Sequence, residues 1–277
     1  MEALKTIVVT GANKGVGYGI VENLFQKPYQ IILACRSLEL ASKAKAKLEV
    51  QFPSSPGKLQ IRQLDVTNAK SIQDFADSFE KENLMIDVLL NNAGMADRQS
   101  EYDEIMFRKT LQTNFYGTVE LTEKMLKNLK YQGKVIFIGS SLGKSNKLKS
   151  EDLANRLNDV SLTKDKLFKL AEEYISEVTQ NTYEKSGWPK WGYVISKLLI
   201  NNYARPLSQY QEVKEKKLQV YTCCPGWVKT DLGTNSAPLT IQEGALTPVY
   251  LVELPFEVNE KLQGKFFHNK EIASLVE

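Results

Sequence analysis

Tyr193 and Lys197 stand four residues apart, in a stretch whose apolar spacing predicts a helix over residues 191–211. Side chains four apart in a helix share one face, so the phenol and the ammonium can converge. A free phenol has a pKa of about 10, and a neighbouring ammonium lowers that pKa by favouring the tyrosinate. The pair is therefore a candidate for acid–base catalysis, with Tyr193 as the acid or base.

Three other polar side chains could assist this chemistry. Ser140 and Ser141 follow the apolar run 135–138, and either hydroxyl could hold the oxygen of a carbonyl substrate. Asn114 lies in a predicted helix over residues 103–130 and could anchor a water on a proton path. Together with the tyrosine and the lysine, these residues predict proton transfer to a carbonyl or from an alcohol.

A glycine-rich turn follows the first apolar run, residues 6–10. Glycines lack a Cβ, so the backbone can turn tightly and bring its N–H groups against a phosphate. A predicted helix over residues 16–27 directs its positive end toward the same anion. The spacing is neither Gly-x-Gly-x-x-Gly nor that of an ATPase phosphate loop. The turn predicts a dinucleotide site that includes Gly11, Asn13, Lys14, Gly15, Val16 and Gly17.

Arg36 ends the second apolar run, where an acidic residue would bind the ribose 2′-hydroxyl of NAD. A cation at that position accommodates a 2′-phosphate instead, and Lys14 is a second cation within reach. The two residues favour NADP over NAD.

The next two strand ends also carry polar or small residues. Asp65-Val66 follows the third run, where the carboxylate can receive the adenine amino group. The segment Asn91–Gly94 follows the fourth, where Asn92, Ala93 and Gly94 let the backbone pass beside the cofactor. Ligands of open α/β sheets bind outside the carboxyl ends of the strands, so these signals describe one site.

Short apolar runs alternate with amphipathic segments along the whole chain. The early runs are continuous, as expected for parallel strands that are covered on both faces. The pattern predicts a single-domain α/β fold, with a doubly wound parallel sheet of about seven strands and helices on both faces. The predicted strands are 6–10, 31–35, 59–64, 88–90, 135–138, 218–223 and 264–268, and the predicted helices are 16–27, 38–50, 69–82, 103–130, 191–211 and 240–253.

Composition excludes several classes of function. The chain has 36 basic and 33 acidic residues, and this net charge of +3 indicates neither a nucleic-acid nor a membrane partner. No apolar stretch approaches the roughly 18 residues of a membrane span. One histidine, His268, makes a metal site or a His-based triad improbable, and no metal is expected. Three cysteines and the absence of a signal peptide at the start favour a cytoplasmic protein.

The motifs in combination resemble the short-chain dehydrogenase/reductase family, and more narrowly its NADPH-dependent carbonyl reductases. The resemblance covers nearly the whole chain, through Thr10-Gly-x-x-x-Gly-x-Gly17, Asp65, Asn91-Asn-Ala-Gly94, Asn114, Ser141, Tyr193-x-x-x-Lys197 and Cys223-Cys-Pro-Gly-Trp-Val-Lys-Thr230. It implies that the tyrosine is the acid or base, that the lysine binds the nicotinamide ribose, and that the asparagine holds a relay water. It also implies that Ser141, the second serine of the pair, steadies the substrate.

The resemblance implies further features around residues 143–190 and 225–239. The segment 143–190 is a helical insertion that ends in Gly187-Trp188-Pro189 and covers the surface by which other members oligomerise, which predicts a monomer. The turn after the sixth strand would pass over the nicotinamide, with 232–239 as a substrate loop. Its cofactor contacts would be Pro225, Gly226, Val228 and Thr230. Substrate contacts are expected at Met95 and Trp227, with Ala96 and Trp191 nearby.

The sequence therefore predicts an oxidoreductase that transfers hydride from NADPH to a ketone, an aldehyde or a quinone. Two alternatives remain open at this point: an alcohol dehydrogenase working toward oxidation, and a non-catalytic NADP-binding redox sensor. Cys224, beside Pro225, is either a reactive thiol or a buried structural residue.

Overall fold

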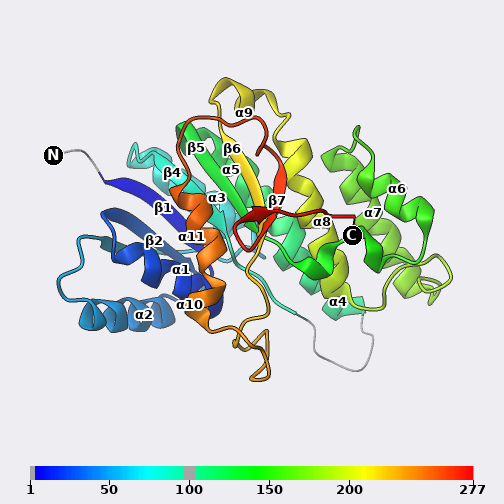
Figure 1. The fold of residues 1–277 in the computed structure, drawn as a ribbon, viewed down its shortest axis with the longest axis horizontal. Coiled ribbons are helices and arrows are strands. Elements are labelled where there is room, and N and C mark those ends of the chain that lie inside the picture. The colour runs from blue at the N-terminus through cyan, green and yellow to red at the C-terminus, as the bar shows by residue number, and fades with distance from the viewer. Residues whose placement is uncertain (1–3, 97–103, 277) are drawn as a thin grey trace.

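The molecule is built on one β-sheet (Figure 1). The computed structural model describes residues 4–96 and 104–276 of the chain. The strand order of the sheet is β3-β2-β1-β4-β5-β6-β7-β8. Neighbouring strands run parallel up to β7, and β8 pairs antiparallel with β7. The order reverses between β1 and β4, which is where doubly wound sheets bind dinucleotides. The strands are β1 (Lys5–Thr10), β2 (Tyr29–Cys35), β3 (Lys58–Gln63), β4 (Ile86–Asn91), β5 (Leu129–Ile138), β6 (Gln219–Cys224), β7 (Lys265–His268) and β8 (Glu271–Ile272).

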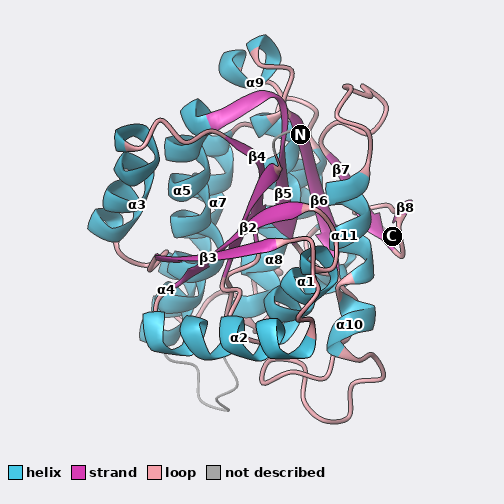
Figure 2. Ribbon diagram, turned by 90° about the vertical axis from the view of Figure 1, so that its left-hand side faces the viewer, coloured by secondary structure: helices cyan, strands magenta, loops and turns pink. Residues whose placement is uncertain are grey.

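Helices cover both faces of the sheet (Figure 2). One apolar core joins one face to α1, α2 and α11, and a second joins the other face to α3, α5, α7 and α8. The helices are α1 (Gly15–Phe25), α2 (Leu38–Gln51), α3 (Ala69–Lys81), α4 (Glu104–Leu111), α5 (Gly117–Met125), α6 (Glu151–Asn158), α7 (Lys164–Thr179), α8 (Gly192–Leu207), α9 (Gln211–Glu215), α10 (Ile241–Gly244) and α11 (Leu246–Glu253).

The continuous apolar runs follow from these two cores. In β1, Ile7 and Val9 point into the core beneath α1, whereas Val8 points into the opposite core, and all three are fully buried. A strand buried on both faces needs apolar residues at every position. The predicted fold class is confirmed, and the predicted strand count is one too low, because β8 is only two exposed residues.

The largest departure from the predicted elements falls in residues 103–130. Position 103 lies outside the described residues, and the remainder is α4, a π-helical turn (Gln112–Tyr116), α5 and a short 3-10 turn (Leu126–Asn128). The chain enters β5 at Leu129, which pairs with Ile86 ahead of a shift in register. Gly117 begins α5 directly after the π turn, and a Cβ there would lie 1.8 Å from the carbonyl oxygen of Val66. The helix therefore passes very close to the end of β3.

The segment 143–190 contains α6 and α7. Helix α7 packs on α8 and α4, and α6 packs on the short turn 145–147. Trp188 is almost completely buried, and its ring centroid lies 5.6 Å from that of Tyr174 in α7. The predicted helical insertion is thus part of the core on the α5 side of the sheet. Within the described ranges 4–96 and 104–276, no helix is both long and apolar enough to cross a membrane.

Candidate active site

Helix α8 presents Tyr193 to the carboxyl end of β5. A hydrogen bond joins the hydroxyl groups of Tyr193 and Ser140, and the tyrosine is 8% exposed. Burial raises the pKa of Tyr193 to about 12, although the Ser140 bond acts in the opposite direction. The neighbouring Lys197 by itself does not lower this pKa, because desolvation of the tyrosinate outweighs the neighbouring groups. Tyr193 therefore holds its proton at neutral pH.

Lys197 lies one turn further along α8, with its Nζ 5.6 Å from the centre of the Tyr193 ring. The ammonium donates a hydrogen bond to the carbonyl oxygen of Ile138 at 2.7 Å, and the residue is 6% exposed. Burial lowers the pKa of Lys197 to about 8, with Cys224 and Cys223 acting in the opposite direction. The side chain is thus held by the strand end and is mostly charged at pH 7.

The structure differs from the prediction at the serine pair. Ser140 is the residue whose hydroxyl meets Tyr193, and it also accepts a hydrogen bond from the Leu142 N–H at 3.1 Å. Ser140 caps the 3-10 turn Ser141–Gly143, and Ser141 is its first residue. The structure therefore places the hydroxyl of Ser140, and not that of the predicted Ser141, against Tyr193. Its position as a turn cap, directly after strand and glycine, is the sequence signal for Ser140.

Asn114 occupies the π-helical turn and is 3% exposed. Its Oδ1 accepts from the Met95 N–H, and its Nδ2 donates to the Met95 carbonyl oxygen, both at 2.8 Å. The same Nδ2 donates to Ser196 Oγ at 2.9 Å. The side chain therefore fixes the segment after β4 to α8, and Ser196 is a supporting residue that the sequence did not single out.

The glycine turn connects β1 to α1 in the predicted place. Gly11 and Gly15 have φ of +62° and +56°, a region that disfavours other residues. A Cβ on Gly17 would lie 2.4 Å from Asn92 Nδ2 and 2.6 Å from the Gly11 carbonyl oxygen. The α1 N-cap residue, Lys14, makes no side-chain cap, and the first turn has no acidic residue. This cradle, with the positive end of α1 behind it, fits the pyrophosphate of a dinucleotide.

Hydrogen bonds tie this turn to the end of β4. Asn92 Nδ2 donates to the carbonyl oxygens of Thr10 and Gly11, at 2.8 and 3.2 Å. Thr10 Oγ1 accepts from the N–H groups of Asn92 and Ala93, at 2.9 Å each. Asn92 and Thr10 thus hold two strand ends together at the switch point, and the predicted Gly94 follows in the same segment. Thr10 is a supporting residue that the predicted site omitted.

The predicted adenine and 2′-phosphate contacts lie on neighbouring strand ends. Asp65 Oδ1 accepts from the N–H and the hydroxyl of Thr67, at 2.9 and 2.7 Å, beside the buried Val66. Arg36 is exposed after β2. Lys14 forms an ion pair with Asp231 at 2.7 Å, between two exposed side chains. An incoming phosphate would therefore compete with Asp231 for Lys14.

The segment after β6 folds over the glycine turn. Gly226 has φ of +83°, and its N–H donates to Cys224 Sγ at 3.3 Å. The chain pairs with itself at Val228 and Leu239. Thr230 lies against Gly15, since a Cβ built there would come within 3.4 Å of Thr230 Cγ2. Pro225, Val228 and Thr230 are thus carried by one ordered loop beside the predicted phosphate cradle.

Of the predicted substrate residues, Met95 follows β4, Trp227 follows β6, and Trp191 precedes α8. Met95 is half-buried and is held through its backbone by Asn114. Trp191 has its ring centroid 5.5 Å from that of Tyr193. Trp227 is 55% exposed, and its indole N–H donates to the Gly233 carbonyl oxygen. Trp191 therefore places an aromatic ring beside that of Tyr193.

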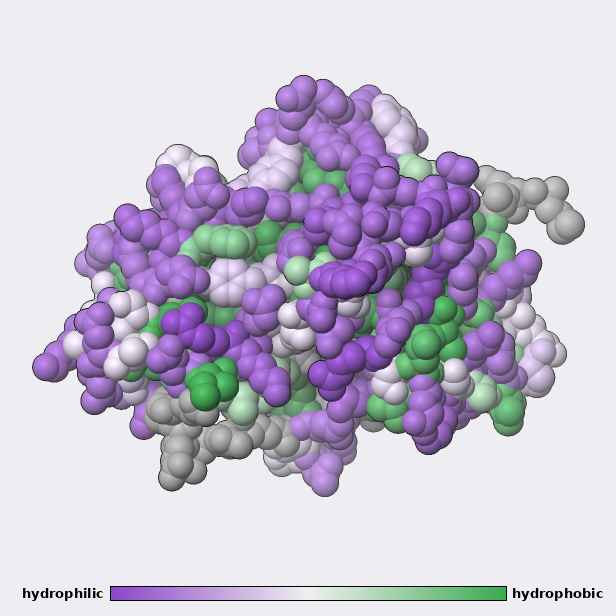
Figure 3. Space-filling model, turned by 180° about the vertical axis from the view of Figure 1, so that it is seen from behind, coloured by the Kyte–Doolittle hydropathy of each residue, from purple (hydrophilic) through white to green (hydrophobic). Residues whose placement is uncertain are grey.

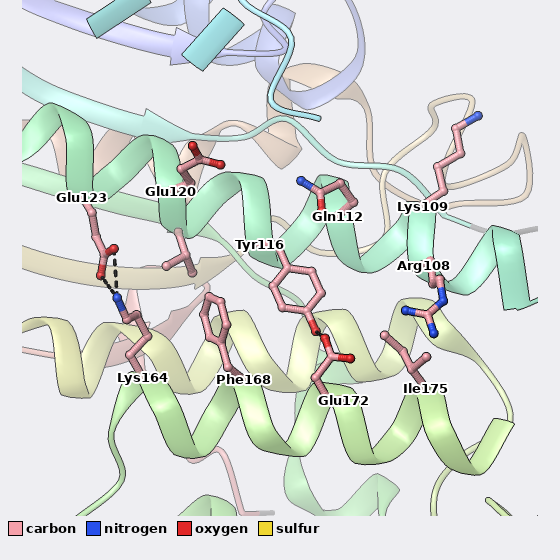
Figure 4. Close-up of a pocket in the computed structure, with 11 residues that line it drawn as sticks. Arg108, Lys109, Gln112, Tyr116, Glu120, Glu123, Lys164, Phe168, Glu172 and Ile175 are labelled. Atoms are coloured by element: carbon pink, nitrogen blue, oxygen red, sulfur yellow. Dashed lines mark hydrogen bonds and ion pairs between the residues drawn. The ribbon is translucent and has the colours of Figure 1, made fainter. Parts of the chain in front are cut away.

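Two surface grooves lie away from Tyr193 and Ser140. One, of about 600 Å³, runs between α1, α2 and α10 and includes Lys14 and Gly15. The other, of about 810 Å³, separates α7 from α4 and α5 and is shown in Figure 4. Neither is lined by Tyr193 or Ser140. Over residues 4–96 and 104–276, no group of three histidine, cysteine or acidic residues could hold a metal ion.

The fold and this arrangement of residues define a short-chain dehydrogenase. A model of the family described as short chain dehydrogenase matches residues 5–150. Full-length relatives extend the match over the rest of the chain, and the protein belongs to this family.

Its relatives include NADPH carbonyl reductases. The chain is 34% identical to carbonyl reductase [NADPH] 3 of Rattus norvegicus, over 98% of each protein. It is 32% identical to carbonyl reductase [NADPH] 1 of Homo sapiens, over 96% of each. Among solved structures, salutaridine reductase from Papaver somniferum has a TM-score of 0.84 at 26% identity, over 96% of this chain and 99% of that one.

Proposed function

We propose that the protein is an NADPH-dependent carbonyl reductase that acts on a ketone, an aldehyde or a quinone. The observation that carries the proposal is the Tyr193–Ser140 hydrogen bond, at the same sheet edge as the glycine turn. Bound NADPH would supply the hydride. Ser140 would hold the carbonyl oxygen, and Tyr193 would donate its proton to that oxygen as negative charge develops there.

The preference for reduction over alcohol oxidation rests on the cofactor, because the same acid–base residues serve the reaction in both directions. Arg36 and Lys14 support NADP, since its 2′-phosphate needs cations, and cells generally keep the NADP pool reduced. A non-catalytic NADP sensor would not need Tyr193 to lie beside both Ser140 and Lys197. This arrangement therefore favours the reductase over the sensor.

Lys197 and Asn114 would orient the cofactor and the segment beside the substrate. Lys197 would place its charge beside the ribose of the bound cofactor, from the position fixed by Ile138. Asn114 would keep Met95 and the end of β4 in place beside the substrate. Its side-chain amide is already engaged by Met95 and Ser196, so a relay water would have to use the backbone of the π turn.

The proposal includes a cytoplasmic location and an apolar substrate. All three cysteines are free and buried, which suits a reducing compartment. Cys224 accepts a hydrogen bond from Gly226 and is 2% exposed, so its role is structural in this proposal. Met95, Trp191 and Trp227 favour hydrophobic carbonyl compounds.

The direct test follows NADPH absorbance with an aromatic aldehyde, a quinone, a diketone and a steroid ketone. NADH is run in parallel. The expected result is oxidation of NADPH with at least one compound. Binding of NADPH without turnover on any of them would count against the reductase and in favour of the sensor.

A further inference from the structure

Three residues of α8 contact the segment that carries Ser140. Tyr193, Lys197 and Asn201 are spaced four apart, so they lie along one side of the helix. Tyr193 bonds the Ser140 hydroxyl, and Lys197 bonds the carbonyl oxygen of Ile138. The third position of this stripe has no role in the proposed chemistry.

The Asn201 amide binds the backbone on both sides of the catalytic serine's turn. Its Oδ1 accepts from the Ser140 N–H at 3.2 Å. Its Nδ2 donates to the carbonyl oxygens of Ser140 and Gly143, at 2.8 Å each. The residue is 1% exposed, so water cannot easily replace these three bonds.

Close packing seats the turn against the helix. A Cβ on Gly139 would lie 2.0 Å from Asn201 Oδ1. A Cβ on Gly143 would lie 2.4 Å from the Lys197 carbonyl carbon and oxygen. The glycines on both sides of Ser140 thus allow the amide to reach the backbone, and the fit leaves no room for a larger side chain.

The direction of the Ser140 hydroxyl depends on this turn. The turn is closed by a bond from the Gly143 N–H to the Ser140 carbonyl oxygen at 3.0 Å. Inside it, the Leu142 N–H donates to Ser140 Oγ, which fixes the side chain toward Tyr193. Asn201 holds both ends of the turn, at residues 140 and 143.

We propose that Asn201 is a positioning residue that sets the Ser140 hydroxyl against Tyr193 by clamping the turn of residues 140–143 to α8. The proposal rests on the proposed reductase function for its kinetic consequence. Its structural content, the clamp, does not depend on that function.

Asn202 provides a matched control on the same helix. It is also an asparagine and 4% exposed, but its Nδ2 donates to the Leu198 carbonyl oxygen within α8. Asn201→Ala and Asn202→Ala therefore each remove one buried amide, and only the first removes bonds to the catalytic turn. Asn201→Ser is a milder variant in case the alanine variant fails to fold, since a hydroxyl keeps some hydrogen-bonding capacity.

The experiment measures kcat and KM with the best carbonyl substrate, NADPH binding by fluorescence, and hydrogen exchange of a peptide covering 138–147. Misplacement of a reacting group by about 1 Å can cost about 100-fold in rate. We expect Asn201→Ala to lower kcat by about that factor, with little change in NADPH affinity and faster exchange in 138–147. Asn201→Ser should show a smaller loss, and Asn202→Ala should resemble the wild type in kcat and in this peptide.

Two outcomes separate the inference from the proposed function. Equal kcat for Asn201→Ala and Asn202→Ala, with unchanged exchange in 138–147, would overturn the role of Asn201 in an active enzyme. If the wild type reduces no carbonyl, the proposed function fails, and the exchange comparison alone decides whether Asn201 clamps the turn.

Discussion

The ammonium of Lys197 lies 2.7 Å from the carbonyl oxygen of Ile138, at the carboxyl end of β5. This bond ties α8 to the end of β5 and holds the lysine Nζ 5.6 Å from the centre of the Tyr193 ring. Burial lowers the pKa of Lys197 and raises that of Tyr193. Both shifts have one physical cause, because a site closed to water disfavours the charged form of each group.

Tyr193→Phe should remove the proton donor while leaving the ring in its place. A positioned general acid contributes about 10² to 10⁴ in rate, and we expect kcat to fall by at least that factor. NADPH affinity, measured by fluorescence, should change little, because the variant keeps Lys197 and the glycine turn. Wild-type turnover in this variant would exclude Tyr193 as the donor.

Ser140→Ala and Ser141→Ala form a matched pair that tests the corrected serine. Loss of one hydrogen-bond donor to a developing oxyanion costs about 10²- to 10³-fold in kcat. We expect such a loss for Ser140→Ala and near-normal kcat for Ser141→Ala, since only Ser140 bonds Tyr193. The reverse pattern would restore the original prediction of Ser141.

Arg36→Asp should shift the cofactor preference from NADPH toward NADH. A hydrogen bond to a charged group contributes about 1.5–3 kcal/mol, so the ratio of kcat/KM for NADPH to that for NADH should fall about 10- to 100-fold. Repulsion between the new carboxylate and the 2′-phosphate acts in the same direction. Lys58→Asp, at another exposed position, serves as the control for net charge. An unchanged ratio would remove Arg36 from the cofactor site.

The stability of the protein should rise between pH 7 and pH 10 because of Lys134. This lysine is fully buried and donates to the carbonyl oxygens of Leu251, Val252 and Leu254 at the end of α11. Burial lowers the pKa of Lys134 to about 7, and Lys5 acts in the same direction. In the unfolded chain the pKa is about 10.4, so between these values the unfolded chain binds more protons and the unfolding free energy increases with pH.

Denaturant unfolding at several pH values measures this slope. Lys134→Met removes the titrating group and should flatten the rise between pH 7 and pH 10, while lowering stability at high pH through the lost bonds. Lys70→Met, on the exposed surface of α3, is the control and should keep the wild-type slope. Equal slopes in all three proteins would contradict the lowered pKa of Lys134.

The protein should sediment as a monomer of 31.3 kDa. Helix α7 lies along α5, where Lys164 pairs with Glu123 at 2.9 Å and Tyr116 bonds Glu172 (Figure 4). A second copy therefore cannot pack directly on that part of α5. Figure 3 shows the rear face as largely hydrophilic, with small scattered hydrophobic areas. A stable dimer or tetramer across a concentration series would contradict this prediction.

Local sequence patterns are enough to predict the sheet and the strand ends at which the candidate site lies. Continuous apolar runs such as Ile7–Val9 predict strands covered on both faces, because no position can face water. The motifs at Gly11–Gly17 and Tyr193–Lys197 predict their own geometry, because a tight turn and one helical turn are local structures. Strand β8 was not predicted, because its two exposed residues carry no periodic signal.

Features that depend on contacts between distant segments could not be predicted from such local patterns. The start of β5 at Leu129 follows from pairing with Ile86, and the π turn at Asn114 lies where α4 and α5 pass Met95 and the end of β3. The choice of Ser140 over Ser141 depends on which hydroxyl α8 meets. The direction of the Tyr193 and Lys197 pKa shifts depends on burial, which a spacing of four residues does not specify. These properties depend on contacts between residues far apart in the sequence, and a local pattern does not specify which distant residues meet.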